Sequence, residues 1–283
     1  MPDSSQASGS AARGWALVAF FVMAFLLMWA CFFTVAFAPI PANTLLGRIL
    51  ILLGAFAPAL AALATTLITE GRCGVRGLLG KVTRWREPAK YYVFALGFMI
   101  AIKLTAALIH RAATGAWPRF GHETLILIPV AIAFSTPFQI GEELGWRGYA
   151  LPGMAARLGF PGASLLLGLI WGAWHLPQFF IREGDSYHQS FPVFVLGTTA
   201  LSVAFAWLYV RTGGSVPLTM LLHAAINNSK DIVPSGVAGG TETFGFHASF
   251  VSWVTLAVLW VSAACFLLDM SKKKGNIELT APD

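Results

Sequence analysis

The fold is decided by residues 15–38, WALVAFFVMAFLLMWACFFTVAFA, an apolar run without a single charge. A helix needs about 20 apolar residues to cross the hydrocarbon core of a bilayer, and this run is longer than that. The Ala-Phe-Ala triplet at 36–38 resembles a signal-peptidase site, but the apolar region of a signal peptide has only about 7–15 residues. We therefore interpret the run as a membrane span that stays in the protein.

Further apolar stretches of the same kind follow along the chain. Together they predict spans at 15–38, 45–69, 91–110, 124–144, 161–182, 191–210, 215–232 and 248–269. The composition agrees, because 57% of the residues are hydrophobic and only 11% are charged, whereas about a quarter are charged in a typical soluble domain. The sequence predicts an all-α fold, a polytopic transmembrane bundle of about eight helices with a polar intramembrane cavity.

We expect one transmembrane domain at 15–270, preceded by a disordered polar N-terminus at 1–14 and followed by a cytoplasmic tail at 271–283. The net charge of +6 does not indicate nucleic-acid binding, because the basic residues lie in short gaps between apolar runs and form no stripe with interleaved aromatics. Thirteen of the nineteen Lys and Arg residues fall in segments that are cytoplasmic if the N-terminus is inside. The positive-inside rule then predicts a multi-pass protein with both termini cytoplasmic, which we assign to a plasma membrane.

A first group of ionisable residues lies at Gly141-Glu142-Glu143-Leu144-Gly145-Trp146-Arg147. On a helix Glu143 and Arg147 are four residues apart and can pair on one face. Glu142 is rotated by about 100° from Glu143, so it is free to act as a general base while its neighbour is held by a cation. The alternative is an interfacial charge cluster that ends the span.

Two later segments add histidines to otherwise apolar helices. His175 follows Trp171 by one turn, and His223 precedes Asn227 by one turn on the same face. Each histidine alone could be a packing residue or part of a helix–helix hydrogen bond. Because polar groups are costly inside a membrane, we expect the three segments to converge on one polar chamber. Lys103, a lone cation in the third span, could pair with a site carboxylate or extend to an interface.

These three segments resemble the motifs of the CPBP family, intramembrane proteases related to the type II CAAX prenyl endopeptidases. The family pattern is E-E-x-x-x-R, then F-x-x-x-H, then H-x-x-x-N. Glu142, Glu143 and Arg147 fit the first motif, and His223 and Asn227 fit the third. His175 fits the second, with Trp171 in place of phenylalanine.

The resemblance covers about residues 124–232 and implies a peptidase that hydrolyses a peptide bond near the cytoplasmic face of the membrane. It implies that Glu142 activates water, that His175 holds or polarises this water, and that His223 and Asn227 stabilise the oxyanion. Arg147 would orient Glu143. The substrate would be a membrane-anchored peptide or protein. Whether it is prenylated stays open.

Zinc is a possible cofactor, with Glu142, His175 and His223 as ligands. The same residues serve a metal-free glutamate mechanism. We slightly prefer the metal-free mechanism because the sequence contains no H-E-x-x-H motif. Two other functions stay open. One is a non-catalytic relative that acts as an immunity or partner-binding protein, and the other is a proton- or ion-coupled transporter, which the missing repeat symmetry disfavours.

Depth in the membrane is the remaining difficulty. His175 lies about 21 Å along a straight helix from Pro161, whereas Glu142 is expected near the cytoplasmic end of its own span. The two can meet only if one of these helices departs from a straight crossing.

Overall fold

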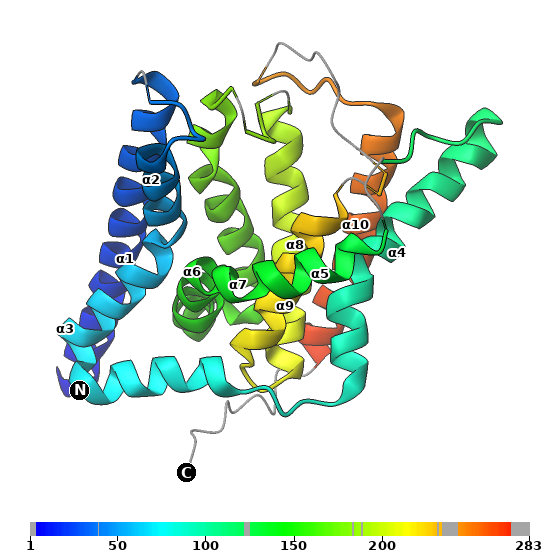
Figure 1. Cartoon of the computed structure of the whole chain (residues 1–283). Helices are drawn as coiled ribbons and strands as arrows, with labels where there is room; N and C mark the ends of the chain where they lie inside the picture. The colour runs from blue at the N-terminus through cyan, green and yellow to red at the C-terminus, as the bar shows by residue number, and fades with distance from the viewer. Residues whose placement is uncertain are drawn as a thin grey trace.

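A computed structural model describes residues 4–38, 40–121, 125–182, 184–187, 189–230, 232–233 and 243–272, with side chains from residue 14. All regular elements of this part of the chain are helical (Figure 1). In chain order they are α1 (Ser4–Phe37), α2 (Leu45–Ala55), α3 (Ala57–Gly80), η1 (Lys81–Thr83), α4 (Ala89–Thr114), α5 (Leu127–Ser135), η2 (Thr136–Gln139), α6 (Ile140–Glu143), η3 (Leu144–Ala150), α7 (Leu151–Trp174), η4 (Leu176–Phe180), α8 (Phe191–Arg211), α9 (Val216–Ser229) and α10 (Phe250–Lys272). The predicted all-α bundle is confirmed. Helix α1 begins at Ser4, so it includes most of the polar N-terminal residues that were expected to be disordered.

The number of full crossings is smaller than the number of predicted spans. By length and composition five described helices can cross a membrane, or six if α2 and α3, which meet at an angle of 49°, are one broken span. Helix α9 has only 14 residues, which gives a length of about 21 Å against a hydrocarbon thickness of about 30 Å. The protein is a multi-pass integral membrane protein. The predicted span 215–232 is too short for a complete crossing, and the predicted spans 124–144 and 161–182 belong to one candidate stretch, Leu127–Phe180.

The segment from α5 to η3 lies across the bundle at about half its height and does not run along it (Figure 1). Its helical type changes from α to 3-10 at η2, back to α at α6, and to π at η3. Pro137 lies in the first turn of η2, where its missing N–H costs no helical hydrogen bond. Single π turns inside helices are frequent at functional sites, and this one directly follows the two adjacent glutamates.

Two glycines turn helices sharply. Gly71 in α3 (φ 67°) and Gly159 in α7 (φ 66°) have positive φ values that side chains with a Cβ rarely adopt. At Gly71 the chain leaves the bundle direction and continues along the lower end of the molecule (Figure 1). At Gly159 α7 is kinked into two helical parts, and residues 160–174 form the second part, which packs beside α8.

Close contacts between the helices depend on small residues, as is typical in membranes. A Cβ on Gly168 would lie 2.6 Å from the Cα of Thr199, and one on Gly145 would lie 2.5 Å from the backbone of Pro58. Helices α7 and α8, and likewise η3 and α3, therefore pack backbone against backbone.

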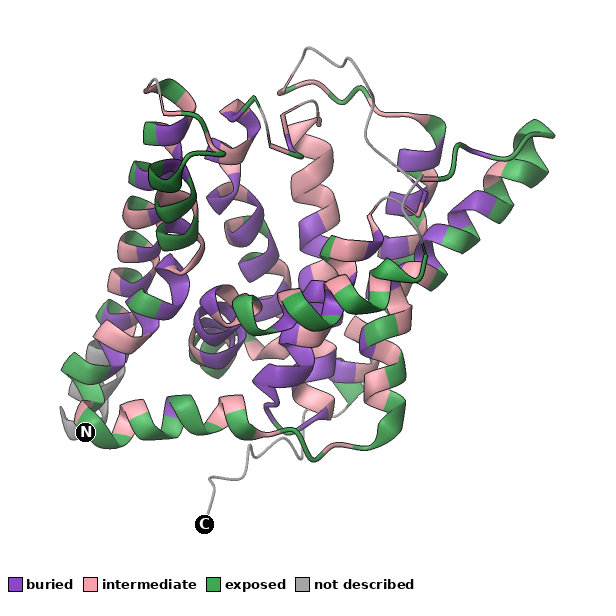
Figure 2. Ribbon diagram, viewed as in Figure 1, coloured by how far each residue is buried: buried purple, intermediate pink, exposed green. Residues whose placement is uncertain are grey.

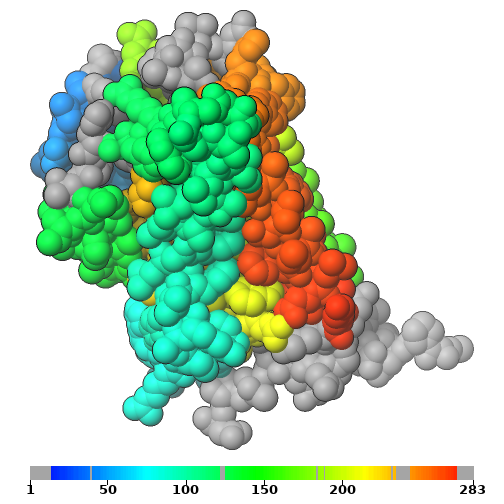
Figure 3. Space-filling view, turned by 90° about the vertical axis from the view of Figure 1, so that its right-hand side faces the viewer, coloured from blue at the N-terminus to red at the C-terminus, as the bar shows by residue number. Residues whose placement is uncertain are grey.

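Buried residues face the interior of the bundle (Figure 2), and many large apolar residues are exposed on its outer surface. Helices α4 and α10 lie side by side on one outer face (Figure 3). Exposed residues there and on α1 include Val18, Leu26, Leu108 and Val261. Such a surface suits lipid and not water.

Candidate active site

An ion pair between Glu143 and Arg147 lies at the centre of the site. Nη1 of Arg147 donates to Oε1 of Glu143 at 2.7 Å, and the side chains are 1% and 0% exposed. The guanidinium also lies over two aromatic rings that meet edge to face, with its central carbon 4.3 Å from the ring centre of Trp171 and 3.9 Å from that of Phe205. The predicted i,i+4 pair forms. However, Arg147 is buried in the site. The thirteen Lys and Arg residues assigned to cytoplasmic segments from the sequence included Arg147, which is therefore not a surface charge.

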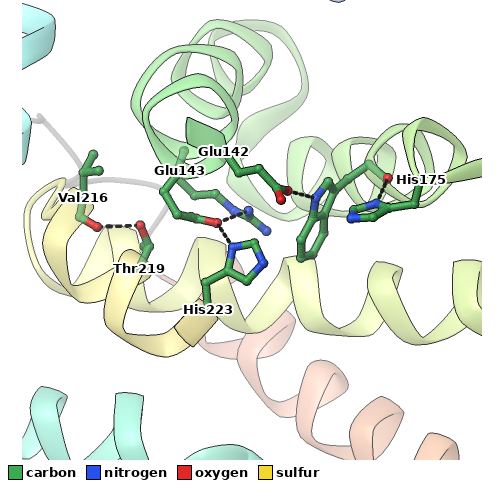
Figure 4. Close-up of polar contacts among 8 residues, drawn as sticks. Glu142, Glu143, His175, Val216, Thr219 and His223 are labelled. Atoms are coloured by element: carbon green, nitrogen blue, oxygen red, sulfur yellow. Dashed lines mark hydrogen bonds and ion pairs between the residues drawn. The ribbon is translucent and has the colours of Figure 1, made fainter. Parts of the chain in front are cut away.

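His223 joins this pair from another helix. Its Nδ1 lies 2.8 Å from the same Oε1 of Glu143 (Figure 4). Because a carboxylate only accepts, Nδ1 carries the hydrogen, and a neutral ring then has its lone pair on Nε2. Glu143 therefore fixes both the position of His223 and the identity of its free ring nitrogen.

Glu142 faces away from this ion pair, as the rotation between adjacent helical residues predicted. The indole Nε1 of Trp171 donates to its Oε2 at 2.7 Å. Within the described part of the chain, the other oxygen of Glu142 has no hydrogen-bond partner, and the side chain is half-buried. Glu143 accepts from two donors on Oε1, and its Oε2 is buried without a described partner. Glu142 also has one oxygen without a described partner, but its side chain is only half-buried.

His175 lies at the C-terminal end of α7, where it is buried. Its Nδ1 lies 2.7 Å from the carbonyl oxygen of Trp171. A carbonyl oxygen only accepts, so Nδ1 is again the protonated nitrogen and Nε2 is free. The ring of Trp171 contacts the rings of both histidines, with centres 5.5 Å from each.

Trp171 links Glu142 to the two histidines, because its indole donates to Glu142 and its ring contacts both imidazole rings (Figure 4). The lateral course of α5 to η3 explains this meeting, because it places Glu142 at half the height of the bundle and not at the cytoplasmic end of a span. The fourth predicted span is thus the one that departs from a straight crossing. The residues between Ser135 and Ala150 turn through 3-10 and π helix, and a pattern of apolar residues does not reveal those turns.

The fourth predicted catalytic residue, Asn227, is on the same helix as His223 but is exposed and makes no hydrogen bond to any described residue. Its neighbour Asn228 instead donates from Nδ2 to Oγ of Ser135 and to the carbonyl of Ala224, both at 2.8 Å. Asn228 thereby attaches α9 to the end of α5. The sequence analysis missed both this contact and the stacking of Phe205 on Arg147, for which no motif gave a signal.

Lys103 does not reach the site carboxylates through any contact that the structure describes. Its Nζ donates to the carbonyl oxygen of Val233 at 2.8 Å, and the side chain is buried. It therefore stabilises the chain just after α9, and its burial excludes the alternative in which it extends to an interface.

A metal fits this arrangement poorly. Both histidines donate their Nδ1 hydrogen to an oxygen, an arrangement that is usual for metal ligands. Nevertheless, among the described residues no group of three or more His, Cys, Asp or Glu side chains is arranged to hold a metal ion. We therefore derive no chemical step through zinc.

Comparison with known proteins supports the motifs. Residues 122–229 match the family described as type II CAAX prenyl endopeptidase Rce1-like. The CAAX prenyl protease 2 of Methanococcus maripaludis is 31% identical over 98 residues, which are 32% of this chain and 36% of that protein. The alignment thus spans about a third of the relative's length. Over this region the predicted resemblance is confirmed.

Proposed function

We propose, from the match of residues 122–229 to the Rce1-like family, that this protein is an intramembrane endopeptidase. The observation that carries the proposal is the unequal binding of the two adjacent glutamates. Glu143 is paired with Arg147 and His223, whereas Glu142 accepts a single indole hydrogen bond. Glu142 is therefore the carboxylate that can take a proton from water.

In the proposed reaction Glu142 removes a proton from a water molecule, whose oxygen attacks the carbonyl carbon of the scissile peptide bond. The free Nε2 of His175 accepts a hydrogen bond from the same water and orients it. When the C–N bond breaks, the proton held by Glu142 passes to the leaving nitrogen. The products are a carboxylate and an amine, and general acid–base help of this kind contributes about 10²–10⁴-fold.

The negative oxygen of the intermediate needs hydrogen-bond donors. His223 can donate from Nε2 only when both ring nitrogens carry hydrogen, because the Nδ1 hydrogen is used on Glu143. The amide of Asn227 is the second proposed donor, since it is one turn from His223 and its side chain is not engaged by any described residue.

The proposed substrate is a membrane-anchored peptide or protein that is cleaved close to its anchor. The name of the archaeal relative refers to CAAX prenyl proteins, so a reporter peptide with a C-terminal CAAX sequence is the first to test, with and without a prenyl group. We further propose that one end of the bundle, where α3 and α10 end, faces the cytoplasm. This end carries most of the basic residues.

The decisive experiment measures cleavage of a membrane-anchored reporter by purified, reconstituted protein. Glu142→Gln removes the proposed base, so we expect it to abolish cleavage. It keeps the size of the side chain and an acceptor for Trp171, so we expect the fold to stay intact. The matched control is Glu70→Gln, the same change at an exposed glutamate of α3. Undiminished cleavage by Glu142→Gln would remove this residue from the mechanism.

Metal dependence is tested on the same reporter. We expect cleavage to survive treatment with a strong zinc chelator and dialysis, because the proposed steps use only protein groups. Loss of cleavage that added zinc restores would replace this mechanism with a zinc-dependent one, with Glu142, His175 and His223 as the ligands to test by substitution.

A further inference from the structure

Residues 72–90 form a basic segment at the lower end of the bundle. Gly71 turns α3 out of the bundle direction, and the chain then runs along this end until α4 begins (Figure 1). A helix that lies across the end of a membrane bundle is positioned at the interface between hydrocarbon and head groups. Its composition fits this position.

Basic side chains of the segment point away from the protein. The exposed ones are Arg72, Arg76, Arg86 and Lys90. Leu79 and Trp85 are also exposed, at 43% and 45%, and tryptophan is enriched at the level of lipid head groups. Only two acidic residues, Glu70 and Glu87, lie at or within the segment. Positive charge next to an exposed leucine and tryptophan is typical of a surface that contacts anionic lipid.

The inward side of the segment holds both halves of the proposed site. Nζ of Lys81 donates to the carbonyl oxygen of Gly148 in η3 at 2.6 Å. Ser215, whose hydroxyl caps the start of α9, donates to the carbonyl oxygen of Arg84 at 2.6 Å. Arg147 lies in η3 and His223 lies in α9, so one interfacial segment is bonded to both elements.

We propose that this basic segment, residues 72–90, binds the anionic head groups of the membrane in which the protein lies. The partner is a phospholipid with net negative charge, such as phosphatidylglycerol. Charge complementarity carries the inference, together with the lateral course of the helix and its two exposed apolar side chains. A soluble acidic protein would not need Leu79 and Trp85 at the level of the hydrocarbon boundary.

The test compares lipid binding by the full-length wild-type protein and three variants of it. Each is purified from mixed micelles of phosphatidylcholine and phosphatidylglycerol, and the retained lipid is counted by native mass spectrometry. The test variant is Arg72→Gln/Arg76→Gln/Arg86→Gln. The control, Arg48→Gln/Arg111→Gln/Arg182→Gln, removes three exposed arginines at the opposite end of the bundle.

We expect the wild-type protein and the control to retain phosphatidylglycerol in preference to phosphatidylcholine. Each Lys or Arg near an anionic surface contributes about fivefold to binding, so the preference should fall by at least about fivefold in the test variant. Soluble glycerol phosphate should not compete, which distinguishes a lipid from a free phosphate ligand. A charge-preserving variant with lysine at the same three positions should keep the preference.

Three results would overturn the proposal: an unchanged preference in the test variant, an equal loss in the control, or full competition by glycerol phosphate. If the test variant does not fold, a salt titration of the wild-type protein decides instead, because binding to exposed charges weakens as screening increases. None of these readouts uses cleavage. A failure here therefore leaves the peptidase proposal standing, and the reverse is also true.

Discussion

Replacing Glu143 by glutamine should lower the free energy of unfolding far more than the same change at Glu142, one residue away. Oε1 of Glu143 accepts from both Arg147 and His223 in a site closed to solvent. Removing its charge leaves the guanidinium of Arg147 buried without a counterion, which costs about 3–5 kcal/mol in other buried pairs. Glu142→Gln weakens one hydrogen bond, which costs about 1 kcal/mol.

The measurement is the free energy of unfolding in mixed micelles, with a rising fraction of denaturing detergent and circular dichroism as readout. We expect Glu143→Gln to be less stable than Glu142→Gln by at least about 2 kcal/mol. The double variant Glu143→Gln/Arg147→Met removes both charges and should recover much of the loss, because apolar replacement of a buried pair is often neutral. Equal stability of the two single variants would refute the assignment of Glu143 as the buried counterion.

Two further comparisons test the packing and the third motif. Gly145→Ala places a methyl group 2.5 Å from the backbone of Pro58 and should lower the free energy of unfolding by about 1–3 kcal/mol. The control Gly77→Ala, with nothing within 4 Å of the added methyl group, should be neutral or slightly stabilising. An unchanged stability of Gly145→Ala would contradict the close packing. Asn228→Ala should lower the free energy of unfolding by about 1 kcal/mol, because it loses its hydrogen bonds. Asn227→Ala should lower cleavage and leave the free energy of unfolding unchanged. A loss of stability in Asn227→Ala would show that its exposed position is misassigned.

The sequence predicted the helical class and the pairing of Glu143 with Arg147 because both depend on local spacing. The i,i+4 separation of Glu143 and Arg147 is a property of any helix, and the pair forms as expected. The rotation between Glu142 and Glu143 likewise predicted that only one carboxylate would be held by the arginine.

The lateral course of α5 to η3 was not predictable from apolar content. A horizontal apolar helix has the same composition as a vertical one, and the change from α to 3-10 to π helix near Pro137 depends on tertiary contacts. The expected depth of Glu142 was wrong for this reason. The exposed position of Asn227 and the contact of Asn228 with Ser135 depend on how α9 meets α5, which one motif on α9 cannot specify.

The shortness of α9 has a consequence for the surrounding bilayer. A helix of about 21 Å cannot span a hydrocarbon layer of about 30 Å. Because α9 is buried among other helices, lipid meets the exposed side of the horizontal α5 next to it, and there it must thin, tilt its chains or admit solvent. Hydrolysis consumes one water molecule for each bond broken, and bulk hydrocarbon contains almost none. We expect the mismatch to shorten the distance between the aqueous phase and Glu142, so that a thicker membrane would slow turnover by restricting the supply of water.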